Sequence, residues 1–113
     1  MELVCRLTAL GAAPVLYLSG EIDLSTVPLL RDQLTRAVSL HPGETLFVDL
    51  DGLMAMDDTG LGMLLGAAGR CRELGADLAV VCTTERLLSR FAITGLDRAI
   101  EVLPRVVQPQ LND

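Results

Sequence analysis

The chain has 113 residues, of which 50% are apolar, 21% are charged and 3% are aromatic. This length and composition suit one hydrophobic core, so we expect a single globular domain and exclude a two-domain protein. The formal net charge of −6 and the scarcity of aromatic rings exclude nucleic acids and anionic membranes as expected partners.

All nine basic residues are arginines, and the chain has no lysine. Schiff-base chemistry, a P-loop and the lysine that senses an aspartyl phosphate are therefore excluded. Arginine-only usage together with abundant Ala, Gly and Leu is typical of a GC-rich genome, and we expect a bacterial source.

Three cysteines occur without a CxxC spacing, so the sequence predicts neither a disulfide framework nor a zinc site. We expect Cys71 and Cys82 to be buried free thiols, with a redox switch between them as the alternative. The N-terminal segment carries Glu2 and Arg6 and has no long apolar run, so we expect a cytoplasmic protein without a membrane span.

Alternation of apolar and polar residues predicts an N-terminal β-hairpin. Residues 3–7 alternate with period two, and residues 15–18 form a short apolar run. The segment 11–14 predicts the turn between the two strands, and the Ser-Gly pair at 19–20 predicts the end of the second strand.

A first helix is predicted after this hairpin. Ser25 or Thr26 is its expected N-cap, Pro28 lies in its first turn, and the His-Pro-Gly sequence at 41–43 ends it. Apolar residues recur at helical spacing at Val27, Leu30, Leu34 and Val38.

The middle of the chain predicts a strand, a loop and a second helix. Residues 45–50 are apolar and rich in β-formers, which favours an interior strand. The helix is expected over 61–74, with Gly75 at C′. Its apolar face is expected to consist of Leu61, Leu64, Leu65, Ala68 and Cys71.

The last third predicts a buried strand over 77–82, a helix from the cap Thr84 to Ile93 that stops at Gly95, and a weak strand over 99–103. This order of elements predicts an α/β domain with a mostly parallel central sheet, entered by an antiparallel hairpin and covered by helices. The domain spans 1–113, with its core over about 3–104 and a short polar C-terminal tail.

The segment 46–52 ends in Asp-x-Asp-Gly and resembles the nucleophile motif of haloacid dehalogenase phosphatases. That resemblance would make Asp49 the nucleophile and Asp51 the acid, but the motif lies in mid-chain and the chain lacks the family's lysine. The alternative is that both carboxylates accept hydrogen bonds from loop N–H groups. A response-regulator receiver domain is excluded because it needs the same missing lysine. The single histidine, His41, lies in a predicted turn and supports neither a catalytic triad nor a metal site. We assign no catalytic residue, metal or cofactor.

The segment 49–65 joins an interior strand to a helix N-terminus through residues rich in carboxylates. Backbone N–H groups and the positive end of the helix favour an anion there, so the sequence predicts a switch site. The structural alternative is a plain N-cap by Asp57 or Asp58.

Several motifs resemble the anti-sigma factor antagonists, whose domain is called STAS. The sequences SGEID at 19–23, VDLDGL at 48–53 and MDDTGLG at 56–62 are similar to the family's first turn, central strand and signature loop. The segments 86–88 and 93–97 are similar to its closing helix and the following turn. The resemblance covers nearly the whole chain and implies the same α/β fold.

The resemblance implies a protein-binding function in transcription regulation. Members of this family bind an anti-sigma factor that is also a serine-protein kinase, and so release a sigma factor. The kinase phosphorylates the serine that follows the signature aspartate. Asp57 matches that aspartate, whereas the phosphoacceptor position is Asp58, and Thr59 is the alternative hydroxyl acceptor.

The same resemblance implies a partner-binding surface. We expect it to contain Glu21, Asp23, Met56, Asp57, Asp58, Thr59, Gly60, Leu61 and Gly62. Met54, Met56 and Met63 are expected as flexible exposed contacts, with burial in the core as the alternative. We expect a monomer or a weak homodimer. The alternative function is a STAS subunit of another assembly, such as a stress-signalling or transporter-associated complex.

Overall fold

The structure, a computed structural model, describes residues 2–10 and 13–106. Within them the chain forms a five-stranded sheet and four helices. In chain order the elements are β1 (Leu3–Leu10), β2 (Ala13–Ile22), α1 (Val27–Leu40), β3 (Leu46–Met56), α2 (Asp58–Glu73), β4 (Leu78–Val81), α3 (Glu85–Thr94), α4 (Leu96–Ala99) and β5 (Glu101–Leu103).

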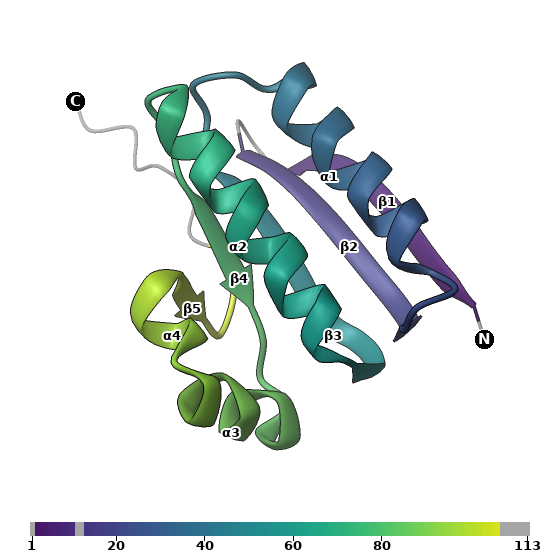
Figure 1. Ribbon diagram of the computed structural model, residues 1–113. Coiled ribbons are helices and arrows are strands. Elements are labelled where there is room, and N and C mark those ends of the chain that lie inside the picture. The colour runs from purple at the N-terminus through teal and green to yellow at the C-terminus, as the bar shows by residue number, and fades with distance from the viewer. Residues whose placement is uncertain (1, 11–12, 107–113) are drawn as a thin grey trace.

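The strands lie in the sheet in the order in which they occur in the chain (Figure 1). β1 and β2 pair antiparallel, with Leu3 opposite Gly20 and Leu7 opposite Leu16. β2, β3, β4 and β5 pair parallel, so their carboxyl ends meet at one edge of the sheet. The predicted α/β fold, with a hairpin leading into a parallel sheet, is confirmed.

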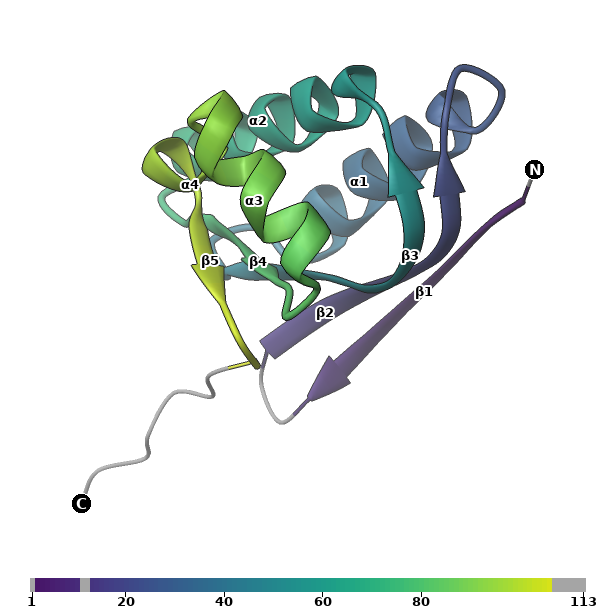
Figure 2. The ribbon, with the colours of Figure 1, turned by 90° about the horizontal axis from the view of Figure 1, so that it is seen from below.

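One face of the sheet carries the helices and the main core. α1 and α2 lie side by side across it, and Figure 2 shows α3 and α4 on the same side. Both long helices bury an apolar stripe, because aliphatic side chains recur every three or four residues. The largest fully buried side chains of this core include Leu16, Leu30, Leu34, Leu50, Leu64 and Phe91.

The opposite face of the sheet has a smaller apolar cluster. Val15, Phe47 and Ala79 form one row across β2, β3 and β4, because the register places each beside the next. Ala13 and Val81 complete the cluster, and Tyr17, Leu103 and Val106 pack against it. Strands that are apolar on both faces read as continuous apolar runs, which explains why the strands β3 and β4 were predictable.

β2 is longer than predicted at both ends. Ala13 and Pro14, which were expected in the turn, belong to the strand, and the rest of that turn lies outside the described residues. The strand also continues past the Ser-Gly pair to Ile22, so the predicted turn there is wrong. The backbone of Gly20 has φ +102°, and a Cβ at this position would lie 2.1 Å from the carbonyl oxygen of Glu2. Glycine therefore lets the start of β1 lie close to β2 at the point where the pairing of β2 with β3 shifts register.

Three other predictions need correction. β3 continues to Met56 where a loop was expected, and α2 starts at Asp58, three residues early. Leu65 is exposed, while Ala67 occupies the buried face in its place. The short helix α4 was not predicted, because four residues carry too little periodicity to be recognised. Of the polar tail predicted after residue 104, residues 107–113 lie outside the described residues.

Candidate functional site

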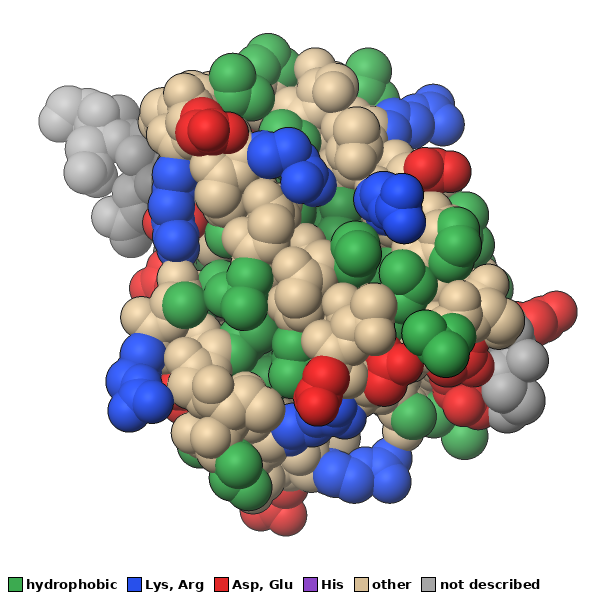
Figure 3. All heavy atoms as spheres, viewed as in Figure 1, with side chains coloured by type: hydrophobic (Ala, Val, Ile, Leu, Met, Phe, Trp, Pro, Cys, Tyr) green, Lys and Arg blue, Asp and Glu red, His purple; other side chains and the backbone are tan. Residues whose placement is uncertain are grey.

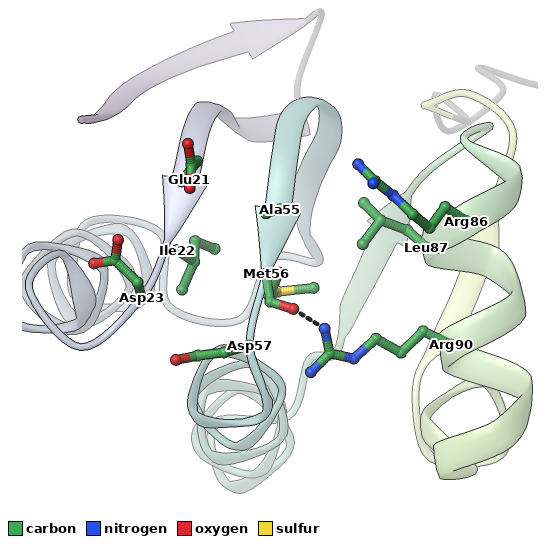
Figure 4. Close-up of a pocket in the computed structure, with 9 residues that line it drawn as sticks. All are labelled: Glu21, Ile22, Asp23, Ala55, Met56, Asp57, Arg86, Leu87 and Arg90. Carbon is green, nitrogen blue, oxygen red and sulfur yellow. Dashed lines mark hydrogen bonds between the residues drawn. The ribbon is translucent and has the colours of Figure 1, made fainter. Parts of the chain in front are cut away.

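A depression of about 390 Å³ lies where the ends of β2 and β3 meet the start of α2 and the side of α3. Figure 4 shows Glu21 and Asp23 on one side of it and Arg86 and Arg90, from α3, on the other. The lining thus brings acidic and basic side chains from distant parts of the chain to one edge of the sheet. In parallel sheets, ligands bind at this edge.

The outer half of β3 is paired on one side by side chains of α3. β4 pairs with β3 only as far as Asp49, whereas β2 continues to pair with it to Met56. On the side that β4 leaves open, the carbonyl oxygens of Met54 and Met56 accept hydrogen bonds from the guanidinium groups of Arg86 and Arg90.

The spacing of these arginines matches the strand. Residues four apart on a helix rise by about 6 Å, and residues two apart on a strand rise by about 6.6 Å. Arg86 and Arg90 therefore meet alternate carbonyl groups of β3, in place of the missing strand.

The signature loop is a helix N-cap followed at once by α2. The Oδ1 atom of Asp57 accepts a hydrogen bond from the backbone N–H of Gly60 at 3.2 Å, which makes Asp57 the N-cap. Gly60 lies against β2 and β3, because a Cβ there would be 2.7 Å from Cγ of Met56 and 2.8 Å from Cγ2 of Ile22. The start of α2 is therefore fixed closely against the ends of both strands. Of the two predicted caps, Asp57 is confirmed.

Asp58, the first residue of α2, points to solvent and forms an ion pair. Its side chain is 85% exposed, and its Oδ1 atom lies 2.5 Å from Nη2 of Arg90, whose side chain is 33% exposed. The same guanidinium also donates to the carbonyl oxygen of Met56. Arg90 thus joins α3 to the end of β3 and to the start of α2.

Asp23 is held in a tight turn between β2 and α1. Its Oδ1 atom accepts hydrogen bonds from the N–H and the hydroxyl of Ser25 and from the N–H of Thr26, at 2.9, 2.6 and 3.2 Å. These bonds, the one from the Ser25 hydroxyl first, lower the pKa of the Asp23 carboxyl below its ordinary value. The carboxylate is therefore fixed in position and ionised at neutral pH.

The predicted partner-binding residues all lie at this edge of the molecule, but they differ in exposure. Asp58 and Gly62 are exposed, and Glu21, Asp23, Asp57 and Thr59 are half-buried. Met56, Gly60 and Leu61 are buried. The last three shape the surface from below, and their side chains are not presented to a partner.

The three methionines have three different environments. Met54 is 68% exposed on β3, and Met63 is half-buried and packs against the core. Met56 is 2% exposed, so the expectation of an exposed contact is wrong for it and the core alternative holds. The reason is a register shift between β2 and β3, where Gly20 pairs with Leu53 but Glu21 pairs with Ala55. Met54 is therefore an extra, unpaired residue of β3, which interrupts the two-residue alternation between Met54 and Met56.

The two carboxylates of the Asp-x-Asp-Gly motif have structural partners. Asp49 accepts a hydrogen bond from the N–H of Asp51 at 3.0 Å, and Asp51 accepts bonds from the N–H and the hydroxyl of Thr83. The motif lies inside β3 and does not end it, which corrects the strand end assumed for a phosphatase site. The bonds between Asp51 and Thr83 connect β3 to the segment that leads into α3.

The other sequence candidates do not line the depression. Cys71 and Cys82 are buried, and burial raises the pKa of both thiols. His41 ends α1 and contacts Glu44 at 3.0 Å. Within residues 2–10 and 13–106, no three metal-ligating side chains lie together, and no helix has the length and apolar character needed to cross a membrane.

Sequence reasoning did not identify Arg86 and Arg90 as site residues. Their i, i+4 spacing places both on one face of α3, and this signal was present in the sequence. Their partners are carbonyl groups and a carboxylate more than thirty residues away, which no local pattern reveals.

Comparison with known proteins identifies the family. The family described as "Mlab, STAS domain" matches residues 5–107. The anti-sigma-B factor antagonist of Listeria monocytogenes is 34% identical over 97 residues, covering 86% of this chain and 82% of that protein. The protein of the same name from Bacillus subtilis is 34% identical over 85 residues, covering 75% of this chain and 76% of that protein.

A solved structure agrees with these matches. The crystal structure of an anti-sigma factor antagonist from Mycobacterium paratuberculosis superposes with a TM-score of 0.78 at 24% identity, over 93% of this chain and 88% of that one. The chain belongs to the STAS-domain anti-sigma factor antagonist family, as its motifs predicted.

Proposed function

We propose that this protein regulates transcription as an anti-sigma factor antagonist. It binds a kinase-type anti-sigma factor through the edge where β2, β3, α2 and α3 meet, and the bound anti-sigma factor releases its sigma factor. The names of the relatives support the role. The observation that carries the proposed site is the position of Asp58, exposed at the start of α2 and beside the depression.

Asp58 is proposed to replace the phosphoserine of the family's switch. A carboxylate at a helix N-terminus is stabilised by the helix dipole, as a phosphate would be, but it carries one negative charge where a phosphoserine carries nearly two. The protein therefore carries a permanent, partial imitation of the phosphorylated state. Thr59, half-buried one residue further on, is the second candidate for phosphorylation.

The surface chemistry supports a protein partner. On the face shown in Figure 3, acidic and basic side chains are interspersed, and they lie next to one another at the lower end, near α3. The net charge of −6 disfavours nucleic acids and anionic membranes. We propose a cytoplasmic protein that acts as a monomer or a weak homodimer without a cofactor and without enzymatic activity.

A second candidate is a STAS subunit of another assembly. The description of the matching family, "Mlab, STAS domain", names the domain and does not name anti-sigma factors. It is therefore compatible with a STAS subunit that binds another kind of partner. The proposed edge would then contact a different partner through the same residues.

The direct test is a transcription assay with a sigma factor and the kinase-type anti-sigma factor encoded in the same genome. Adding the wild-type chain is expected to restore transcription only when it is in large excess over the anti-sigma factor, because Asp58 weakens binding. Met54→Asp, on the exposed end of β3, is expected to abolish the effect, because it places a charge where an apolar contact is proposed. Leu74→Asp is the matched control, since Leu74 is also exposed but lies at the far end of α2. Equal loss in both variants, or no effect of the wild type, would contradict the proposal.

A further inference from the structure

α3 reaches the proposed site through Leu87 and through polar side chains. Its backbone lies closest to α4, and its buried side chains belong to the main core. Its buried anchors are Leu87 and Phe91, one turn apart. On the side that faces the site, Arg86 and Arg90 form the connections to β3, and Arg90 alone of the two also contacts α2.

Arg90 divides its donors between a constant and a variable acceptor. The carbonyl oxygen of Met56 is part of the backbone and is present whatever residue occupies position 58. The carboxylate of Asp58 is a side-chain acceptor, and a serine there would remove the charge, while a phosphoserine would nearly double it. The guanidinium has five N–H donors in a planar fork, so it can serve both acceptors at once.

We propose that Arg90 is a positioning residue that transmits the charge of residue 58 to α3. With a negative charge at position 58, Arg90 draws α3 toward the start of α2. With a neutral residue, the charge attraction is lost while the carbonyl contact remains, and α3 moves more freely. The proposal rests on the proposed function in one respect, which is that α3 then becomes an adjustable part of the partner-binding edge. Ile93, 83% exposed and one turn after Arg90, is the apolar side chain that such a movement would shift.

The test uses the protein alone. Amide chemical shifts of residues 85–94 are measured in ¹⁵N-labelled wild type, Asp58→Asn, Arg90→Gln and the double variant. Asp58→Asn is expected to shift amides of α3 in the wild-type background. In the Arg90→Gln background the same substitution is expected to leave the α3 amides within error of the single variant, because the transmitting side chain is gone.

Arg86→Gln is the matched control. Arg86 also donates to a β3 carbonyl group, but no contact joins it to Asp58, so Asp58→Asn should shift the α3 amides as much in this background as in the wild type. Arg90→Lys keeps the charge without the fork and is expected to keep a reduced response, which also preserves the test if Arg90→Gln misfolds.

Two results would overturn the proposal. One is an Asp58→Asn effect confined to α2, and the other is an equal α3 response with and without Arg90. Neither result depends on a partner protein. Loss of transmission would leave the proposed function intact, and failure to bind an anti-sigma factor would leave the transmission intact.

Discussion

The carboxylate of Asp58 lies 2.5 Å from the guanidinium of Arg90, which is 32 residues further along the chain. The pair connects the first residue of α2 to the middle of α3 across the edge where the parallel strands end. This contact places a cation beside position 58, which the proposed function makes the switch of the site. Its strength and its role in binding can be measured separately.

The ion pair is expected to add little to stability, because Asp58 is largely exposed and solvent screens the pair. A double-mutant cycle of Asp58→Asn and Arg90→Gln in urea unfolding should give a coupling of about 0.2 to 1 kcal/mol. The coupling should decrease at about 1 M salt, where charges are screened within roughly 3 Å. A coupling that is unchanged by salt would show that the contact is not an ion pair in solution.

Two glycines of α2 should respond in opposite ways to alanine. At Gly60 the new methyl group would meet Met56 and Ile22 below 3 Å, so Gly60→Ala should lower the free energy of unfolding by about 1 to 3 kcal/mol. At Gly62 no atom lies within 4 Å of the new methyl group. Gly62→Ala should therefore raise the free energy of unfolding by about 0.5 to 1 kcal/mol, because alanine has the higher helix propensity. Thermal or urea unfolding measures both, and equal effects would contradict the close packing of α2 on the strands.

Neutral substitutions test whether partner binding depends on the acidic residues of the proposed site or on the negative charge of the whole surface. Asp23→Asn and Asp57→Asn keep the turn and the cap, since asparagine accepts the same backbone hydrogen bonds. Each is expected to weaken partner binding by at least about fivefold, which corresponds to about 1 kcal/mol. Glu73→Gln, at the end of α2, and Glu101→Gln, at the start of β5, are exposed at the opposite edge of the sheet; they are the controls and should change binding by less than about twofold. Similar losses at all four positions in a calorimetric titration would mean that binding is diffuse electrostatics.

The buried thiols should be unreactive in the folded protein. Burial raises the pKa of Cys71 and Cys82, so little thiolate is present at neutral pH and the reagent has poor access. Cys5 is half-buried and is the internal comparison, although burial raises its pKa as well. Alkylation followed by mass spectrometry should label Cys5 first. Rapid labelling of the other two, or a disulfide between them under mild oxidation, would support the redox alternative.

The sequence predicted helices and strands correctly where apolar residues recur at a regular spacing. α1, α2, β4 and α3 each bury a regular apolar pattern, and their predicted bounds agree with the structure to within a few residues. The end of β3 was not predictable in this way. Its polar residues Asp49 and Asp51 and the glycine that follows interrupt the apolar run, and the strand continues because β2 and the arginines of α3 satisfy its backbone.

The candidate site was predicted only in part, for a related reason. The acidic loop and its cap are local features, and spacing along the chain was enough to find Asp57 and Asp58. The contribution of α3 depends on packing between segments that are distant in the sequence. The resemblance to a family included Arg86 in the segment 86–88 but gave it no role at the site, and it did not include Arg90.

The most direct test of the account compares wild type with Asp58→Ser for binding to the kinase-type anti-sigma factor, before and after incubation with that partner and ATP. The serine variant removes the permanent charge and restores the phosphoacceptor, so it is expected to bind more tightly than wild type and to lose that affinity as it is phosphorylated. Wild type should bind weakly and show no change with ATP. Tighter binding by wild type would contradict the account, because Asp58 would then be a direct contact, and ATP-dependent phosphate on Thr59 of the wild type would show that the switch lies one residue further along.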